Sequence, residues 1–316
     1  DHEARFPYAF SVGISVADNL VAGLLTAKAA WDNSSLSFRR PTLAVAVGCE
    51  NTHRCTVLTT MCQKMRQTGQ DLGFDMIGEY QFEDTSLPNA VQQMKLAGPD
   101  VFVGCVDAAR AVNLAVTARA LGFSPKAMLI TEGTAQGFVD AVGPANANYI
   151  LSPTAWDSRR ENLSCRIFGD AGGFASAYKN RFGTLPDLLA ASAAASGLAL
   201  LAAVENMGSW PLTAEEIKQG LRNLNLNTFY RKLAFGPNGT LRDARSMVQQ
   251  VQPLAASLSM LERASGARVE IVDAAGSLPL FPMPNWQDKA LEVFPCEAGF
   301  VDLDANGSCV GCPAGT

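Results

Sequence analysis

A histidine flanked by two cysteines and an acidic residue is the group of side chains in this sequence that most resembles a reactive centre. The stretch GCENTHRC, residues 48–55, places His53 beside Cys49, Cys55 and Glu50. Cysteine–histidine pairs form activated nucleophiles, and the same residue types bind zinc. A metal site would need a second cysteine or histidine cluster at a matching distance, and none is nearby in the sequence. We therefore predict that His53 is a loop or cleft-lining side chain and that no metal is bound.

The other motifs associated with catalysis are incomplete. CVGC, residues 309–312, has the spacing of a redox pair or half a zinc site, but it stands between the turn-rich stretches DANGS and PAGT. A redox motif begins a helix after a strand, so structural disulfides are favoured here. GISVA at Gly13 lacks the closing glycine of a nucleophile elbow, and neither a GxGxxG nor a P-loop motif occurs. The sequence predicts a protein that is not an enzyme and uses no cofactor.

Composition excludes two further classes of protein. Apolar residues make up 48% of the chain and charged residues 17%, which predicts a globular protein and not a disordered one. The net charge is −5, and lysines and arginines form no run longer than a pair. Nucleic acid is therefore not expected as a partner.

Cysteines and glycosylation triplets indicate the compartment. The chain has eight cysteines, and it has N-x-S/T triplets at Asn33, Asn162, Asn238 and Asn306. Together they favour an oxidising, secretory environment, so we predict an extracellular or cell-surface protein glycosylated at these asparagines. The N-terminus does not resemble a signal peptide, so either processing has removed one or the chain is a piece of a longer protein. The uncharged segment 188–204 is better explained by a buried core helix than by a membrane span.

From residue 41 onward, strand-like and helix-like patterns alternate. Apolar runs of strand length occur at 42–48, 74–80, 100–106, 126–130 and 149–153. Helical patterns occur at about 52–72, from Ser86 with Ala90, Val91, Met94 and Leu96 on one face, at 108–121 and at about 135–142. Strands that are apolar on both faces and alternate with helices predict an α/β fold, with a parallel sheet covered by helices.

The carboxyl ends of parallel strands form the edge at which ligands bind. In this sequence the loops at that edge are 48–55, 106–111, 131–136 and 152–158. The loop 131–136, TEGTAQ, contains Glu132 next to a glycine. A carboxylate in a partly desolvated cleft needs a cation, and an amine ligand supplies one, although Glu132 is equally compatible with a solvated loop.

Several stretches in order resemble one family. They are FPYAF, PTLAVAVG, GFDMIGEYQFEDTSLPNAVQQMKLAGPDVFVGC, ARALGFSPKAMLITEG, and LAFGPNGT before MVQQVQP. Across roughly residues 6–253 the chain resembles the type 1 periplasmic binding proteins, in particular the leucine/isoleucine/valine-binding kind and the receptor ligand-binding regions built on it. The resemblance implies a two-lobed α/β fold that holds a small molecule in the interlobe cleft and responds by hinge closure. The resemblance also implies that FPYAF forms a strand.

The resemblance is incomplete in the first lobe. The family's N-terminal βα units, which supply serine and threonine groups for a ligand carboxylate, have no counterpart in this sequence. The expected binding domain is 1–273, comprising a first-lobe remnant (1–40 and 184–245) and a second lobe (41–183 and 246–273), followed by a linker (274–295). We expect exposed apolar faces at Val21, Leu24 and Leu25 and on the helix 188–204, with a tendency to aggregate. A homodimer would form through the first lobe.

The resemblance also implies roles for individual residues. Glu132 corresponds to a glutamate that pairs with the ammonium group of an amino-acid ligand. Thr52 or His53 matches a cleft position, and Asp107 and Ala108 fall where the family often has aromatic contacts. Trp156 is expected either to close the pocket wall or to be an ordinary buried tryptophan. An amino acid or another amine is thus the expected ligand.

The C-terminal residues 296–316 resemble the start of an ephrin-receptor-like cysteine-rich module. This implies a cell-surface receptor whose downstream domains are absent from this chain. Cys296 and Cys309 are expected to pair across a short turn-rich loop, which leaves Cys312 without a partner in this chain. Cys49 and Cys105 follow neighbouring strands, so each is within reach of the other or of Cys55.

Two functions remain compatible with the sequence. The first is an extracellular small-molecule-binding domain of a receptor that signals by hinge closure. The second is an adhesion or scaffold ectodomain that keeps the fold and binds no small molecule. Retention of Glu132 favours the first, and absence of the first-lobe anion-binding segment favours the second.

Overall fold

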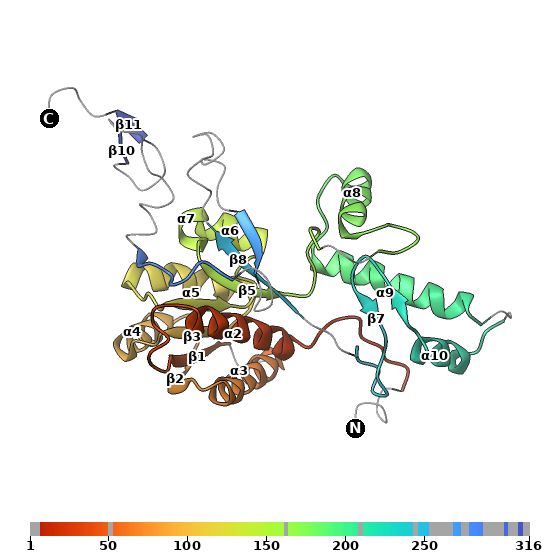
Figure 1. The fold of residues 1–316 in the computed structure, drawn as a ribbon, viewed down its shortest axis with the longest axis horizontal. Helices are drawn as coiled ribbons and strands as arrows, with labels where there is room; N and C mark the ends of the chain where they lie inside the picture. The colour runs from red at the N-terminus through yellow and green to blue at the C-terminus, as the bar shows by residue number, and fades with distance from the viewer. Residues whose placement is uncertain are drawn as a thin grey trace. The chain divides into compact units, whose positions relative to one another are not determined.

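A seven-stranded sheet lies at the centre of the larger of two units (Figure 1). The computed structural model describes residues 7–49, 53–160, 164–207, 211–242, 246–252, 268–272, 278–286, 300–302 and 309–311. Unit 1 comprises Asp1–Asn19 and Thr154–Ser246, and unit 2 comprises Leu20–Pro153 and Met247–Thr316. The boundaries between the units therefore lie between residues 19 and 20 and between residues 153 and 154. The expected lobe boundaries lie near residues 40 and 183.

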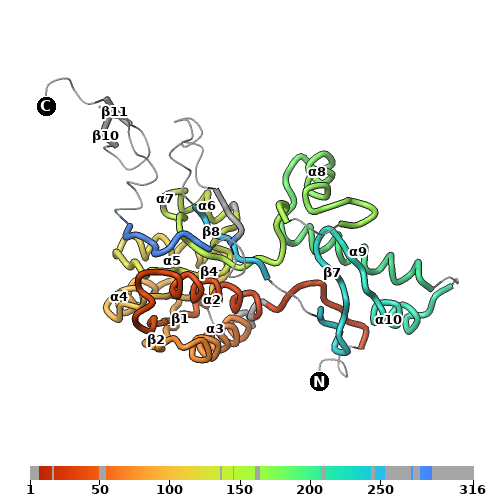
Figure 2. The backbone as a smooth tube through the Cα atoms, viewed as in Figure 1, coloured from red at the N-terminus to blue at the C-terminus, as the bar shows by residue number. Residues whose placement is uncertain are grey.

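The sheet of unit 2 has the strand order β2-β1-β3-β4-β5-β8-β9. Its strands are β1 (Thr42–Gly48), β2 (Asp75–Phe82), β3 (Val101–Cys105), β4 (Ala127–Ile130), β5 (Ile150–Thr154), β8 (Met247–Gln252) and β9 (Arg268–Val272). The pairs from β2 to β5 are parallel, and β8 and β9 are antiparallel. Figure 2 traces how β8 returns next to β5. The predicted α/β fold with a parallel sheet is confirmed.

Helices cover both faces of this sheet (Figure 1). The helices of unit 2 are α2 (Val16–Asp32, which begins in unit 1), α3 (His53–Asp71), α4 (Leu87–Ala97), α5 (Ala108–Leu121), α6 (Gln136–Val142) and α7 (Pro144–Ala147). The helices α4 to α7 share one core with Ala44, Phe102 and Ile130 of the strands. On α2 and α3, Gly23 lies against Leu129, and Gly69 lies against Leu43. Alternate residues of the strands thus pack on opposite layers of helices.

Two predicted helix faces need correction. Leu96 is 78% exposed, because the buried face of α4 is formed by Leu87, Ala90, Val91 and Met94. Ser86 is the N-cap residue of α4, but its side chain accepts a hydrogen bond from the Glu83 amide at 3.0 Å and makes no capping bond. Leu24, expected on an exposed face, is fully buried on α2, whereas Leu25 is exposed as predicted.

Unit 1 is built around three helices. They are α8 (Ala171–Phe182), α9 (Leu188–Glu205) and α10 (Ala214–Arg222), with the short antiparallel pair β6 (Leu226–Asn227) and β7 (Lys232–Leu233). Asp170, Asp187 and Thr213 cap the three helices by accepting hydrogen bonds from backbone amides in the first turn. One core cluster of this unit contains Trp156, Phe174 and Phe229.

The N-terminal segment FPYAF was wrongly predicted to be a strand. The described residues 7–15 have no regular structure. This segment makes a backbone hydrogen bond from the Ser11 amide to the Gly239 carbonyl at 2.9 Å. Aromatic packing holds it as well, because the Phe10 and Phe235 rings lie 5.2 Å apart in an edge-to-face arrangement. This hydrogen bond and this ring contact position the segment without making it a strand.

The helix α9 is less buried than expected for a core helix. Its buried residues are Ala191, Ala195, Ala199 and Ala203, which form a single narrow face. Within the described part of the chain it is the one helix long and apolar enough to cross a membrane, and 22% of that window is buried. Length and composition alone are weak evidence for a span, and no membrane role is assigned to it.

The described residues of unit 2 contain two disulfides. Cys49 is bonded to Cys55, which is one of the alternatives expected from sequence. Cys105 is bonded to Cys62 of α3, a partner that the sequence did not indicate because Cys62 occupies the apolar face of the helix. Cys296 and Cys312 lie outside the described residues, so the pairing of Cys296 with Cys309 stays a prediction. Two short strands, β10 (Phe300–Asp302) and β11 (Cys309–Gly311), form an antiparallel pair in this region.

Candidate functional site

The carboxyl ends of three central strands meet at one edge of the sheet of unit 2. Val47 of β1 is in register with Cys105 of β3, and Gly104 is in register with Ile130 of β4. The loops that follow these strands are therefore brought together, as the sequence predicted. This edge is where doubly wound sheets bind ligands.

The loop after β4 is held in place from both sides. The Thr131 hydroxyl accepts a hydrogen bond from the Val106 amide at 2.9 Å and donates to the Val106 carbonyl, which ties this loop to the end of β3. The Thr134 hydroxyl donates to Gln249 of β8 at 2.7 Å. Thr131 and Thr134 are buried, whereas Glu132 between them is exposed. The loop is thus a rigid support that presents one carboxylate.

Glu132 has a backbone conformation that is unusual for its residue type. Its φ is 63°, in the left-handed region that glycine ordinarily occupies. The glycine of this turn is instead Gly133, where a Cβ atom would lie 2.8 Å from Ile150 and 3.1 Å from the Ile130 carbonyl oxygen. Strained backbone at an exposed polar residue is a feature of functional sites. Tyr149 is the other described residue of this kind, with a φ of 69°, but its side chain is buried.

Asp107 and Ala108, two predicted contact residues, begin α5. Asp107 is the N-cap, and one of its carboxylate oxygens accepts from the Arg110 amide at 3.0 Å. Its other carboxylate oxygen accepts from the Arg110 guanidinium at 2.7 Å. Ala108 is exposed and offers only a methyl group. Asp107 is therefore engaged in helix capping and charge neutralisation, which a ligand would have to displace.

The loop after β1 is closed by the disulfide between Cys49 and Cys55, whose Cα atoms are 5.3 Å apart. His53 is the first residue of α3, so its backbone lies at the sheet edge. Thr52 lies outside the described residues, and so does the side chain of His53. Their predicted contact with a ligand stays a prediction.

Trp156 belongs to unit 1, where it is 6% exposed. Its ring lies 6.0 Å from that of Phe174 in an edge-to-face arrangement. Of the two alternatives expected from sequence, the structure shows a tryptophan packed in a core cluster. Asp157, next in the chain, is buried and binds Arg159 through a 2.7 Å ion pair.

Electrostatics single out Glu132 among the carboxylates considered for the site. Asp107 and Asp157 each face a neighbouring arginine, and Glu50 lies outside the described residues. Within the described part of the chain, the Glu132 carboxylate has no hydrogen-bond or ion-pair partner. An exposed carboxylate on a rigid loop is able to bind a cationic group. The same described residues contain no group of three or more His, Cys, Asp and Glu side chains that could hold a metal ion.

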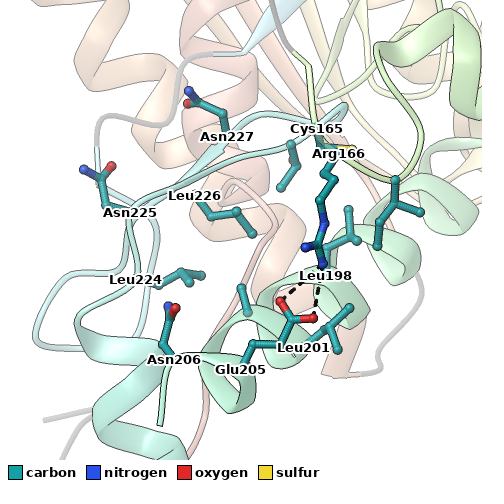
Figure 3. Close-up of a pocket in the computed structure, with 13 residues that line it drawn as sticks. Cys165, Arg166, Leu198, Leu201, Glu205, Asn206, Leu224, Asn225, Leu226 and Asn227 are labelled. Atoms are coloured by element: carbon teal, nitrogen blue, oxygen red, sulfur yellow. Dashed lines mark hydrogen bonds and ion pairs between the residues drawn. The ribbon is translucent and has the colours of Figure 1, made fainter. Parts of the chain in front are cut away.

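A cavity of about 260 Å³ lies in unit 1, and none of the predicted ligand-binding residues lines it. Leu198 and Leu201 of α9 form part of its apolar wall, and asparagines of the segment 224–228 form part of its rim. Figure 3 shows the Arg166 guanidinium next to the Glu205 carboxylate. The two groups form an ion pair with a distance of 3.2 Å. Both side chains are exposed, and their opposite charges neutralise each other. Sequence reasoning missed the cavity because its residues come from distant segments.

Two of the four predicted glycosylation sites can be placed. Asn33 and Asn238 are both exposed and lie in turns. The Asn33 side-chain amide donates to the Ala29 carbonyl at 2.8 Å, and the Asn238 side chain accepts from the Thr240 hydroxyl at 2.8 Å. Asn162 and Asn306 lie outside the described residues. Modification at all four asparagines stays a prediction.

A helix-covered parallel sheet whose loops meet at its carboxyl edge is an architecture that solute-binding proteins share with other α/β proteins. The family model described as periplasmic binding protein matches residues 57–256, which is more than half of the chain. The chain belongs to the periplasmic binding protein family. The members of this class bind substrates and are not enzymes.

Solved structures of bacterial binding proteins share the fold. A leucine-binding protein from Thermotoga maritima has a TM-score of 0.60 and 18% identity, covering 81% of this chain and 66% of its own. A leucine-, isoleucine-, valine-, threonine- and alanine-binding protein from Brucella ovis gives 0.62 and 14%, covering 81% and 61%. An extracellular ligand-binding receptor from Rhodopseudomonas palustris gives 0.59 and 14%, covering 81% and 68%. This chain spans about two-thirds of the length of these proteins.

Proposed function

We propose that this chain binds an amino acid or another small amine at the carboxyl edge of the sheet of unit 2, with Glu132 as the anchor of the ammonium group. The observation that carries the proposal is the conformation of Glu132. Its exposed carboxylate stands on a loop fixed by Thr131 and Thr134, and its backbone is held at a φ of 63°. A site that keeps a strained glutamate beside a glycine uses the carboxylate for something other than folding.

The comparisons support the chemical class of the ligand. Two of the structurally similar proteins are named for binding leucine or a set of small amino acids. Each such ligand carries an ammonium group and so needs an anionic partner. The other predicted contacts on this edge, Thr52, His53, Asp107 and Ala108, are part of the proposal.

The setting of this activity is proposed as well. The family and the two disulfides support a location outside the cytoplasm, where disulfides persist. We place the domain in the ectodomain of a cell-surface receptor, where ligand binding would favour a closed hinge state and pass the signal to further domains. The alternative is an adhesion or scaffold ectodomain, which would bind no amine.

The test is a binding panel with a matched pair of variants. Isothermal titration calorimetry of the purified chain against the amino acids and simple amines should identify a ligand. Glu132→Gln should weaken its binding roughly ten- to hundredfold, the loss expected for one charge-assisted hydrogen bond of about 1.5–3 kcal/mol. Glu79→Gln removes an exposed carboxylate from β2, where it pairs with Arg66, and should leave the affinity unchanged.

Three outcomes would count against the proposal. Unchanged affinity of Glu132→Gln for a confirmed amine would remove Glu132 as the anchor. Equal losses in Glu132→Gln and Glu79→Gln would indicate a general effect of charge. Absence of any amine ligand would favour the adhesion or scaffold function.

A further inference from the structure

Two arginines of unit 1 lie together, and neither has a carboxylate partner among the described residues. Arg231 is 4% exposed, and its Nη2 donates to the Ala155 carbonyl at 2.6 Å. Its Nε is buried and has no hydrogen-bond partner in the part of the chain that the structure describes. Arg160 is half-buried, and its Nη1 donates to the Tyr230 carbonyl at 3.3 Å. In the described part of the chain, both guanidinium groups bind only backbone carbonyls.

Other arginines of the described chain are instead paired with carboxylates. Carboxylates within 4.0 Å are found for Arg39, Arg40, Arg66, Arg110, Arg159 and Arg166. All six pairs have at least one side chain that is more exposed than that of Arg231. A buried charge without a counterion is costly, so the most deeply buried arginine is the one with the greatest need for an anion.

Charge repulsion adds to this need. Burial lowers the pKa of Arg231 to about 10, an effect that the Tyr230 phenol opposes and the Arg160 guanidinium reinforces. Burial also lowers the pKa of Arg160. Arg231 remains cationic at neutral pH, and the two guanidinium groups are close enough for their charges to interact. An anion bound beside them would relieve both the desolvation and the repulsion.

Neighbouring side chains add further hydrogen-bond donors and an aromatic wall. The indole Nε1 of Trp156, the residue after Ala155, is buried and has no acceptor in the described structure. The Arg231 guanidinium carbon lies 5.0 Å from the centre of the Tyr230 ring. Burial raises the pKa of the Tyr230 hydroxyl, so it stays protonated and able to donate. The segments 155–160 and 230–231 thus hold several donors, and the buried carboxylate within them, that of Asp157, is paired with Arg159.

We propose that Arg231 and Arg160 form a binding site for a small free carboxylate within unit 1. The guanidinium group matches the planar carboxylate in shape and donor geometry. Arg231 is only 4% exposed, so a small free acid suits this position better than an acidic side chain of a partner protein. The site lies within unit 1 and does not use Glu132, so the two proposals rest on different residues.

The experiment compares acetate and formate with chloride at constant ionic strength and pH. Titration calorimetry and thermal unfolding of the purified chain should show saturable binding of acetate and a rise in Tm that chloride does not reproduce. Arg231→Met replaces the guanidinium group with an apolar side chain. This variant should bind acetate at least tenfold more weakly. Arg166→Met removes an exposed arginine of the same unit and should bind acetate as the unmodified chain does.

A second variant covers the case in which Arg231→Met does not fold. Arg160→Gln changes a half-buried side chain and should also weaken acetate binding at least tenfold. The proposal is overturned if acetate and chloride act alike, or if acetate binding persists in both variants. Binding of sulfate or phosphate without acetate would overturn the assignment to carboxylates. Acetate has no amine, so its binding is independent of Glu132.

Discussion

Cys62 on α3 is bonded to Cys105 at the end of β3, with their Cα atoms 6.0 Å apart. This bond joins a covering helix to a central strand across a sequence separation of 43 residues, whereas Cys49 and Cys55 are separated by only 6. A crosslink restricts the unfolded chain more strongly when it closes a longer loop. The two disulfides should therefore differ in how much they stabilise the protein.

We expect the paired substitution Cys62→Ala with Cys105→Ala to lower the free energy of unfolding by about 4 kcal/mol. The pair Cys49→Ala with Cys55→Ala should lower it by only about 2 kcal/mol, because its loop is short. Urea unfolding followed by circular dichroism measures both values. Equal losses, or a larger loss for the short loop, would contradict the entropic explanation.

The left-handed backbone at Glu132 predicts a conflict between stability and binding. Glu132→Gly relieves the strain at a φ of 63° and removes the carboxylate. We expect the free energy of unfolding to rise by up to about 1 kcal/mol, because glycine adopts this conformation without steric cost. Amine binding should be lost at the same time. Thermal unfolding and calorimetry of the same variant measure the two effects, and a destabilised Glu132→Gly would show that the residue serves the fold.

Asp100 predicts a pH dependence of stability. Burial opposes its ionisation, but hydrogen bonds from Arg39, at 2.6 and 2.7 Å, and from Thr42 outweigh burial and lower the pKa of Asp100. Because the folded-state pKa lies below the unfolded value, the carboxylate stabilises the fold above about pH 4. This contribution is lost as the pH falls through the folded-state pKa.

Asp100→Asn should therefore destabilise the chain by about 1–3 kcal/mol at pH 7 and by much less near pH 2. Asp75→Asn is the control, since Asp75 is exposed and lies 3.9 Å from Arg40. Its effect should stay below about 0.5 kcal/mol at either pH. Urea unfolding at several pH values distinguishes the two variants. A loss of stability in Asp100→Asn that does not depend on pH would refute the role assigned to the Asp100 carboxylate.

The exposed leucines of α9 predict self-association. Leu189 is 74% exposed and Leu200 is 49% exposed on a helix without charged residues between Asp187 and Glu205. We expect concentration-dependent association of this chain, reduced in Leu189→Glu with Leu200→Glu. Val116→Glu, a change on the exposed face of α5, should have no such effect. Sedimentation velocity measures the distribution, and a monomer at all concentrations would contradict the prediction.

The alternation of strands and helices in unit 2 was determined by the sequence, because local patterns carry it. The helix α5 has the predicted bounds, since Asp107 caps its start and Gly122, with a φ of 67°, ends it. Apolar runs such as 42–48 are long enough to be buried strands and too short to be helices. These signals are contained within the segments themselves. The position of Glu132 after β4 follows from them as well.

Tertiary structure alone decided which of these segments meet. Leu24 and Leu25 are adjacent and equally apolar, but only Leu24 is directed into the core. Cys105 bonds Cys62 because α3 lies over β3, a relationship that depends on packing and not on sequence distance. Arg160 and Arg231 become a pair of cations only when 155–160 and 230–231 fold together. Contacts between distant segments depend on the packing of whole layers, and no local pattern records that.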